Sequence, residues 1–246
     1  MAKTKITPKM LKQTKLIQKE VQRITEQNYK AIAKVFVDFG NDTEKQFAKI
    51  TMQDLKWDVL KSRLDIVLST NSKRSTKSFV NFLNKLFDFK LKTDKIETVE
   101  NETVNQYAKG LAKKVTYVTE TTKNQIAILI DNNKGLNTND LAKLINEKFV
   151  EISKGRARTI ARTESASLFS KSNRSIADEV GLKYATWIHG VSSPNERSHH
   201  RALSGTKIST KDKFIVNGKE CNGPHDDVLG AEDIVNCSCT CFFSNR

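Results

Sequence analysis

Apolar residues recur every three or four positions through most of the first 180 residues, which is the spacing of one face of an α-helix. The first such stripe follows Pro8 and predicts a helix that ends at Gly40, because glycine often marks a helix end. Its members are Ile17, Val21, Ile24, Ala31, Val35 and Phe39. A second helix is predicted over residues 43–68. The start of the chain is therefore expected to form a helical hairpin or bundle.

The polar residues 69–78 interrupt this pattern and predict a break, which a short helix over residues 79–87 follows. Further helices are predicted over residues 98–132 and from Thr138, which suits an N-cap. The Ser-Lys-Gly step at residues 153–155 predicts the start of another helix, which ends near Gly181. Residues 183–188 alternate in polarity as a strand does.

These patterns predict an α+β protein with long N-terminal helices and a compact C-terminal α+β domain of short strands. We expect a basic helical region over residues 1–95, a second helical part over 96–182, and a small α+β end region over 183–246. The last part is set apart because it holds all four histidines and all four cysteines.

Charge is distributed as unevenly as the histidines and cysteines. Residues 1–188 carry the whole net charge of +14, because they contain 35 Lys and Arg against 21 Asp and Glu. Residues 189–246 contain seven basic and seven acidic residues. Such a surplus favours a polyanionic partner, and the alternative is a solvated lysine surface. No apolar stretch approaches the roughly 20 residues of a membrane span, and no apolar run follows the basic N-terminus as in a secretory signal. Assembly in the cytosol is expected.

The histidines and cysteines are candidate metal ligands. Tetrahedral zinc takes four nitrogen or sulfur donors, and Cys237 and Cys239 have a spacing that can supply two of them. His200 is the third candidate, and the fourth is Cys221, His225 or Cys241. Two alternatives to a structural zinc ion stay open, namely buried free thiols and a late disulfide of the Cys221–Cys237 type.

A metal-dependent nuclease of the HNH type is a further alternative, because Asn217 and His225 follow the His199-His200 pair at tolerable spacings. The simpler interpretation is that His200 forms hydrogen bonds within a turn-rich fold. Arg158 and Arg162 lie four residues apart on one helix face and favour a structural or interface role. No phosphate-binding loop or nucleophile elbow is present in the sequence, so ATPase activity is not expected.

Five pieces of sequence occur in one order over about residues 120–243. They are GRARTIARTESASLFSKSNRSIADEVG, the strand that ends at Trp187, RSHHRALSG, FIVNG and NCSC. This order resembles the phage Mu F-like family of head morphogenesis (minor head) proteins. The motif residues on which the resemblance rests are Arg162, Thr163, Glu164, Trp187, Arg197, His200, Leu203, Gly205, Phe214 and Asn236. Ser238 stands where the family usually has arginine, and Cys221 and Cys241 lie outside the family pattern.

The resemblance implies a minor capsid component of a tailed phage that is not an enzyme and is assembled in the host cytoplasm. Such a protein lies inside the head near the portal and aids assembly or genome delivery. Its implied partners are the portal protein, the major capsid protein and packaged double-stranded DNA, with no membrane in the mature particle. The residues expected to contact DNA or portal are Lys3, Lys5, Lys9, Lys12, Lys15 and Lys19. Two alternatives to a minor head protein stay open, namely the nuclease and a soluble module that binds DNA without sequence preference.

Overall fold

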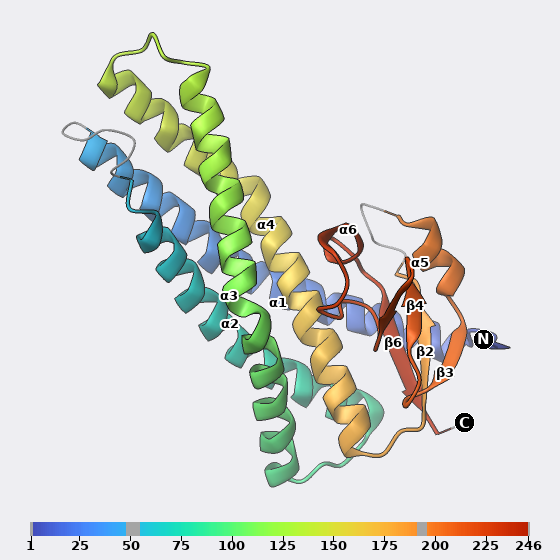
Figure 1. Cartoon of the computed structure of the whole chain (residues 1–246). Helices are drawn as coiled ribbons and strands as arrows, with labels where there is room; N and C mark the ends of the chain where they lie inside the picture. Colours follow the sequence, from blue (N-terminus) through green and yellow to red (C-terminus); the bar gives the residue numbers. More distant parts are fainter. Residues whose placement is uncertain (1, 48–54, 191–195, 246) are drawn as a thin grey trace. The chain divides into compact units, whose positions relative to one another are not determined.

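A computed structural model describes residues 2–47, 55–190 and 196–245 of the chain. Within this part the first 180 residues are almost entirely helical, and the C-terminal residues form short strands and helices (Figure 1). The long helices are α1 (Pro8–Phe47), α2 (Trp57–Phe87), α3 (Thr93–Asp131) and α4 (Thr138–Glu179). The α+β fold class predicted from the sequence is confirmed.

The predicted helix end at Gly40 is wrong, because α1 continues to Phe47. A Cβ atom at Gly40 would lie 2.7 Å from Phe149 Cβ and 2.8 Å from Asn146 Oδ1, both on α4. Glycine at this position therefore permits the close approach of two helices and does not end one. The bounds predicted for the second helix, residues 43–68, are therefore wrong as well. Residues 43–47 belong to α1, and α2 begins at Trp57. Residues 48–54 lie outside the described residues.

Two further predicted breaks are also absent, at residues 69–78 and at residues 153–155. Residues 69–78 lie inside α2, where the small polar residues Ser75 and Thr76 are fully buried. The step at 153–155 lies inside α4, with Ser153 buried and Gly155 exposed. Small polar side chains are thus packed inside these helices and do not mark loops.

Residue contacts divide the chain into two compact units. Unit 1 comprises Met1–Thr25, Ser72–Tyr107 and Arg162–Arg246, and unit 2 comprises Glu26–Asn71 and Ala108–Ala161. Every long helix thus contributes residues to both units. The sequence-based division at residues 95 and 182 stays a prediction.

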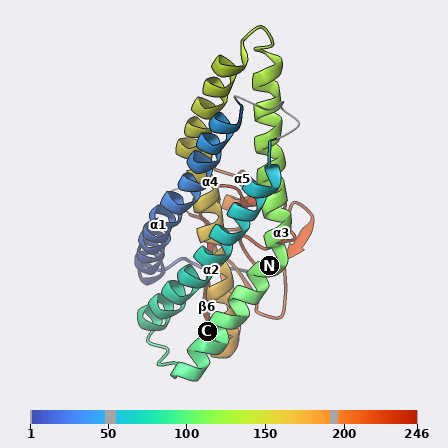
Figure 2. The same ribbon diagram turned by 90° about the vertical axis from the view of Figure 1, so that its left-hand side faces the viewer.

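Among its described residues, unit 2 consists of helix segments and their connections and contains no strand. Its α3–α4 hairpin turns at residues 132–137, and Figure 2 shows the two helices leaving that turn antiparallel. The Phe39 ring of α1 packs against the Trp57 ring at 5.7 Å and against the Phe149 ring at 5.2 Å, measured between centroids. Arg158 forms an ion pair with Glu26, and its guanidinium lies 4.3 Å from the centre of the Tyr29 ring.

Unit 1 contains an antiparallel sheet with the strand order β1-β3-β2-β6. The strands are β1 (Ala2–Lys3), β2 (Tyr184–Ile188), β3 (Thr206–Ser209) and β6 (Thr240–Ser244). The strand predicted over residues 183–188 is β2, which pairs with β3 on one side and β6 on the other. β1 was not predicted: it pairs Ala2 with Lys207 and Lys3 with Thr206, so the N-terminal residues form one edge of the sheet.

The remaining elements of unit 1 are short. A hairpin joins β4 (Phe214–Val216) and β5 (Lys219–Cys221), while α5 (Ser198–Leu203) and α6 (Ala231–Ile234) lie in the connections. The core between them is centred on the fully buried Trp187 of β2, whose ring contacts Phe214 edge-on at 5.4 Å. All four cysteines are free thiols and belong to buried positions of this core.

None of the helices in the described part of the chain is both long enough and apolar enough to cross a membrane.

Candidate functional site

Most of the motif residues converge on one region of unit 1, around α5 and the turn that follows α6. Arg197 precedes α5, His200 and Leu203 lie on it, and Gly205 follows it. The Gly205 N–H donates to the carbonyl of Trp187 (2.9 Å), so the end of α5 is tied to β2. Glu164 is the exception, since its carboxylate accepts a 2.8 Å hydrogen bond from Tyr107 of α3 elsewhere in unit 1.

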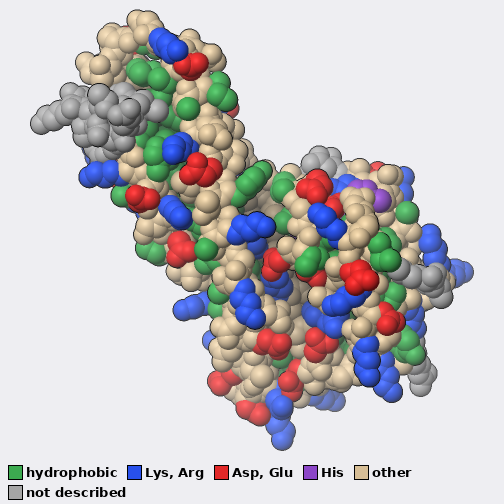
Figure 3. All heavy atoms as spheres, in the orientation of Figure 1, with side chains coloured by type: hydrophobic (Ala, Val, Ile, Leu, Met, Phe, Trp, Pro, Cys, Tyr) green, Lys and Arg blue, Asp and Glu red, His purple; other side chains and the backbone are tan. Residues whose placement is uncertain are grey.

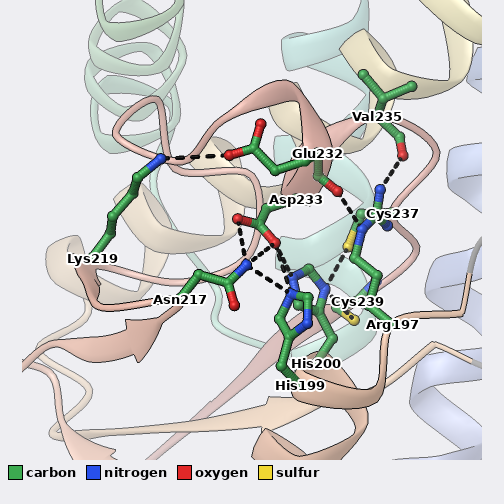
Figure 4. A network of polar contacts seen from close by, with 10 residues as sticks. All are labelled: Arg197, His199, His200, Asn217, Lys219, Glu232, Asp233, Val235, Cys237 and Cys239. Atoms are coloured by element: carbon green, nitrogen blue, oxygen red, sulfur yellow. Dashed lines mark hydrogen bonds and ion pairs between the residues drawn. The ribbon is translucent and has the colours of Figure 1, made fainter.

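Three candidate metal ligands meet at the centre of this region (Figure 4). The Nδ1 atom of His200 lies 3.5 Å from Cys237 Sγ and 3.7 Å from Cys239 Sγ. The three side chains are buried, with exposed fractions of 2%, 3% and 8%, and their donor atoms all lie within 4.8 Å of one another. The sequence-based grouping of His200, Cys237 and Cys239 thus corresponds to a cluster of nitrogen and sulfur atoms.

Cys221 is not part of this cluster. It ends β5 in the core, where burial raises the pKa of its thiol to about 11. Burial, and next the charge of Cys221, raise the pKa of Cys241 as well. The fourth zinc ligand expected among Cys221, His225 and Cys241 is therefore not found with the other three in the described part of the chain.

A second set of polar side chains lies at the opposite edge of the His200 ring, next to Nε2. Its Nε2 atom lies 3.3 Å from Asp233 Oδ1, with an angle outside hydrogen-bond geometry. His199 Nε2 donates to the same Asp233 oxygen at 2.7 Å, and Asn217 Nδ2 donates to it at 3.1 Å. Burial opposes ionisation of Asp233, but the hydrogen bonds from His199 and Asn217 and the charge of both histidines lower the pKa of this carboxyl on balance. Asp233 is thus an anion held between two histidines.

The electrostatics of the two sulfur atoms are linked. The Cys237 thiol donates to the Cys239 sulfur, which raises the pKa of Cys237 and lowers the pKa of Cys239. Burial acts against the ionised form of both, whereas His200 and the Gly190 N–H favour the Cys239 thiolate. Glycine is needed at position 190, because a Cβ atom there would lie 2.1 Å from the Ser238 carbonyl oxygen. The backbone of residue 190 therefore lies directly against residues 236–239, the turn after α6 that carries Cys237 and Cys239 and is called the cysteine turn below.

Residues of α4 hold the cysteine turn from the other side. Asn236 has a positive φ of 58°, which reverses the chain just before Cys237. The Asn236 N–H donates to Thr163 Oγ1 (3.3 Å), and Arg162 donates to Asn236 Oδ1 (3.3 Å). Arg162, Thr163 and Asn236, which are far apart in sequence, are thus one hydrogen-bonded unit.

Arg197 connects α5 to the end of α6. Its guanidinium donates to the backbone carbonyl of Glu232 and, at 2.8 Å, to that of Val235 (Figure 4). Carbonyl groups at the end of a helix lack intrahelical partners, so a guanidinium that binds two of them fixes the start of the cysteine turn.

The residues of the nuclease alternative are only partly assembled. Asn217 lies 3.3 Å from His199 Nε2, but His225 lies elsewhere. His225 lines a cavity of about 90 Å³ together with Lys171, Arg174 and Asp226. Two residues of the site were not predicted from the sequence. Asp233 belongs to no motif, and the role of Gly190 depends on a contact with residues nearly 50 positions away.

The six N-terminal lysines expected to contact DNA or portal are all exposed, on β1, on the segment before α1 and on the first turns of α1. None of them forms an ion pair with another described residue. On the face of the molecule in Figure 3, by contrast, basic and acidic side chains are interspersed. These lysines therefore present positive charge that the described residues do not neutralise.

Comparison with known proteins shows that the region with the motif residues matches a family. The sequence pattern of the phage Mu protein F-like proteins matches residues 97–242, which include most of α3, all of α4 and the whole candidate site. An NAD(+)-arginine ADP-ribosyltransferase of Enterococcus faecalis is 30% identical over 105 residues, which are 41% of this chain and 21% of that protein. The chain thus matches about a fifth of the length of this curated relative. No solved structure matches the chain.

The matched region covers more than half of the chain and contains all ten motif residues. Proteins of this family are phage head morphogenesis proteins, components of the virion that are in general structural and not enzymatic. The resemblance inferred from the five sequence pieces is confirmed, and the chain belongs to the phage Mu protein F-like family.

Proposed function

We propose that this chain is a minor head protein that lies inside the capsid near the portal, contacts packaged DNA without sequence preference and catalyses no reaction. Its partners are then the portal protein, the major capsid protein and double-stranded DNA. The observation that carries the proposal is the exposed lysine face at the start of α1, which forms no ion pair with a described acidic residue, in a chain whose family builds phage heads.

The geometry of this face suits a phosphate backbone. Lys12, Lys15 and Lys19 are spaced three and four residues apart, so they lie on one side of α1. At a rise of 1.5 Å per residue they span about 10 Å, which is about three phosphates of one DNA strand. Lysine provides a point charge on a flexible stem, which favours contact with phosphate over reading of bases.

The same helix is also suited to bind a protein surface. Leu11 and Leu16 are 49% and 40% exposed beside the lysines. An acidic, partly apolar surface of the portal or inner capsid would contact both kinds of side chain. Unit 1, in which the α5 and α6 segments are fixed by Arg197, would act as a rigid docking body.

The DNA contact is tested by the salt dependence of duplex binding. Each phosphate that a lysine neutralises contributes about 0.9 to the slope of log affinity against log salt concentration. The variant in which Lys12, Lys15 and Lys19 become glutamine should lose about three units of that slope. The matched control replaces three exposed lysines of α3, namely Lys109, Lys113 and Lys123. Equal losses in both variants would show that α1 has no particular role.

The position in the particle is tested with phage that lack the protein. Heads that assemble, package DNA and infect normally without it would contradict the proposal, as would an absence of portal cross-links in intact heads. The non-catalytic role is tested by incubation of duplex DNA with the protein and Mg²⁺, Mn²⁺ or Zn²⁺. Cleavage that disappears in the His199→Ala variant would favour the nuclease instead, because His199 contacts Asn217 and remains partly exposed.

A further inference from the structure

We propose that His200, Cys237 and Cys239 bind one zinc ion, which ties α5 to the cysteine turn, and that Asp233 orients the histidine. The inference concerns a metal site within unit 1 and goes beyond the proposed function. It is independent of where the protein lies in the particle.

The donor set favours zinc. Two sulfur atoms and one imidazole nitrogen form a soft set that calcium and magnesium, which prefer oxygen, do not use. The three side chains come from two segments of chain, α5 and residues 237–239, as is common in zinc sites. They also lie at the centre of a buried region, so a substrate has no direct access to the ion. The site is therefore structural.

The spacing of the donor atoms agrees with tetrahedral coordination. Zinc lies about 2.3 Å from a cysteine sulfur and about 2.0–2.1 Å from a histidine nitrogen, which in a tetrahedron places the two donors about 3.6 Å apart. The Nδ1 atom of His200 lies 3.5 Å from Cys237 Sγ and 3.7 Å from Cys239 Sγ. Both distances are those that a shared zinc ion requires.

The surroundings of the donors suit a metal as well. Zinc on Nδ1 leaves the ring proton of His200 on Nε2, which faces Asp233 Oδ1 at 3.3 Å. That Nε2 atom is buried and has no hydrogen-bond partner in the described part of the chain. Asp233 is itself held by His199 and Asn217. A carboxylate that accepts this ring proton fixes the tautomer and orientation of a zinc-bound histidine, and Asp233 lies close enough to His200 Nε2 to take that role when the metal is bound.

The sulfur atoms receive support from the backbone. The Cys239 N–H donates to Cys237 Sγ (3.4 Å), and the Gly190 N–H donates to the Cys239 sulfur. Such bonds stabilise negative charge on thiolates, the form in which cysteine binds zinc. Among the described residues no fourth histidine, cysteine or carboxylate joins the three, so our assignment is limited to these three protein ligands.

The first test is the metal content of the full chain, produced with zinc in the medium and purified under reducing conditions. We expect one zinc per chain by elemental analysis. Removal of the zinc with a chelator should lower the melting temperature, and Zn²⁺, but not Mg²⁺, should restore it. A chain that is folded without stoichiometric metal, and that takes up neither Zn²⁺ nor Co²⁺ after reduction, overturns the proposal.

The second test assigns the ligands by substitution. Cys239→Ala should abolish stoichiometric zinc binding, whereas Cys221→Ala, a buried cysteine outside the cluster, should keep one ion. Asp233→Asn should still bind one ion at saturation, with an affinity about 10–100-fold lower, as expected for loss of a carboxylate behind a histidine ligand. Loss of zinc in Cys221→Ala, or full affinity in Cys239→Ala, would refute the assignment.

A third measurement needs no variant and covers the case in which Cys239→Ala fails to fold. Co²⁺ bound to the wild-type chain should give the visible spectrum of a tetrahedral ion together with thiolate-to-metal absorption in the near ultraviolet. An octahedral spectrum without thiolate absorption would exclude the two cysteines as ligands.

Discussion

Gly40 and Gly155 offer a sharp test of the helix packing, because both are glycines inside long helices of unit 2 and only one is crowded. Alanine at either site gains about 1 kcal/mol of helix propensity. At Gly40, however, the new methyl group would lie 2.7 Å from Phe149 Cβ, an atom too close to the α4 backbone to rotate away. At Gly155 no atom lies within 4 Å of the added Cβ.

The difference between the two variants isolates the packing cost, since the propensity gain is common to both. Overpacking of a filled interior costs about 1–3 kcal/mol. Gly155→Ala should therefore stabilise unit 2 by about 0.5–1 kcal/mol, and Gly40→Ala should lie about 1–3 kcal/mol below it. At about 2–4 °C per kcal/mol for a chain of this size, the melting temperatures should differ by about 2–12 °C.

Urea and thermal unfolding, followed by circular dichroism and by tryptophan fluorescence in a shared Trp187→Phe background that leaves Trp57 as the one tryptophan, measure this difference in unit 2. Trp57 is suitable because its ring packs on Phe39, next to the crowded position. A Gly40→Ala variant as stable as Gly155→Ala would refute the close approach of α1 and α4, and with it the reason given for the uninterrupted α1.

The remaining predictions concern unit 1. Tyr107→Phe removes a buried hydrogen bond to the Glu164 carboxylate and should cost about 1.5–3 kcal/mol in urea unfolding, whereas Tyr117→Phe, at an exposed position, should cost almost nothing. Burial, and next Glu164, raise the pKa of Tyr107 well above its usual value, so its stabilising effect is complete below a pH of about 10 and is lost as pH rises through the folded pKa. Stability measured against pH should therefore fall less in alkali for Tyr107→Phe; an identical fall contradicts this account. Arg197→Lys should lose one of two carbonyl contacts at the end of α6 and cost about 1–2 kcal/mol, while the exposed Arg201→Lys should be neutral by the same thermal measurement.

The helical character of the first 180 residues could be predicted from apolar spacing alone, but the ends of the helices could not. Gly40, the polar residues 69–78 and the 153–155 step all have the composition of breaks. Their effect depends on what packs against them, and a partner such as Phe149 is more than 100 positions away from Gly40. Local sequence carries no record of that contact. The two-residue strand β1 was missed because two residues form no pattern.

The candidate site was predictable to the extent that side-chain chemistry is unusual. His200, Cys237 and Cys239 belong to rare residue types with soft donor atoms, and their grouping could be proposed before the fold was known. Cys221 has the same chemistry but ends a strand facing the core, which its type does not reveal. Asp233 is one of 28 acidic residues, so only its position beside the His200 ring sets it apart.

The pairing of β1 with β3 has a consequence for the order in which the protein matures. The partners Lys3 and Thr206 are joined only after some 200 further residues have been translated, which takes about 10–40 s at usual rates of synthesis. During that interval the residues of β1 lack the strand that later pairs with them. The pairing of β1 with β3 is thus a late, long-range event, and the β1 residues stay available to chaperones until β3 has left the ribosome.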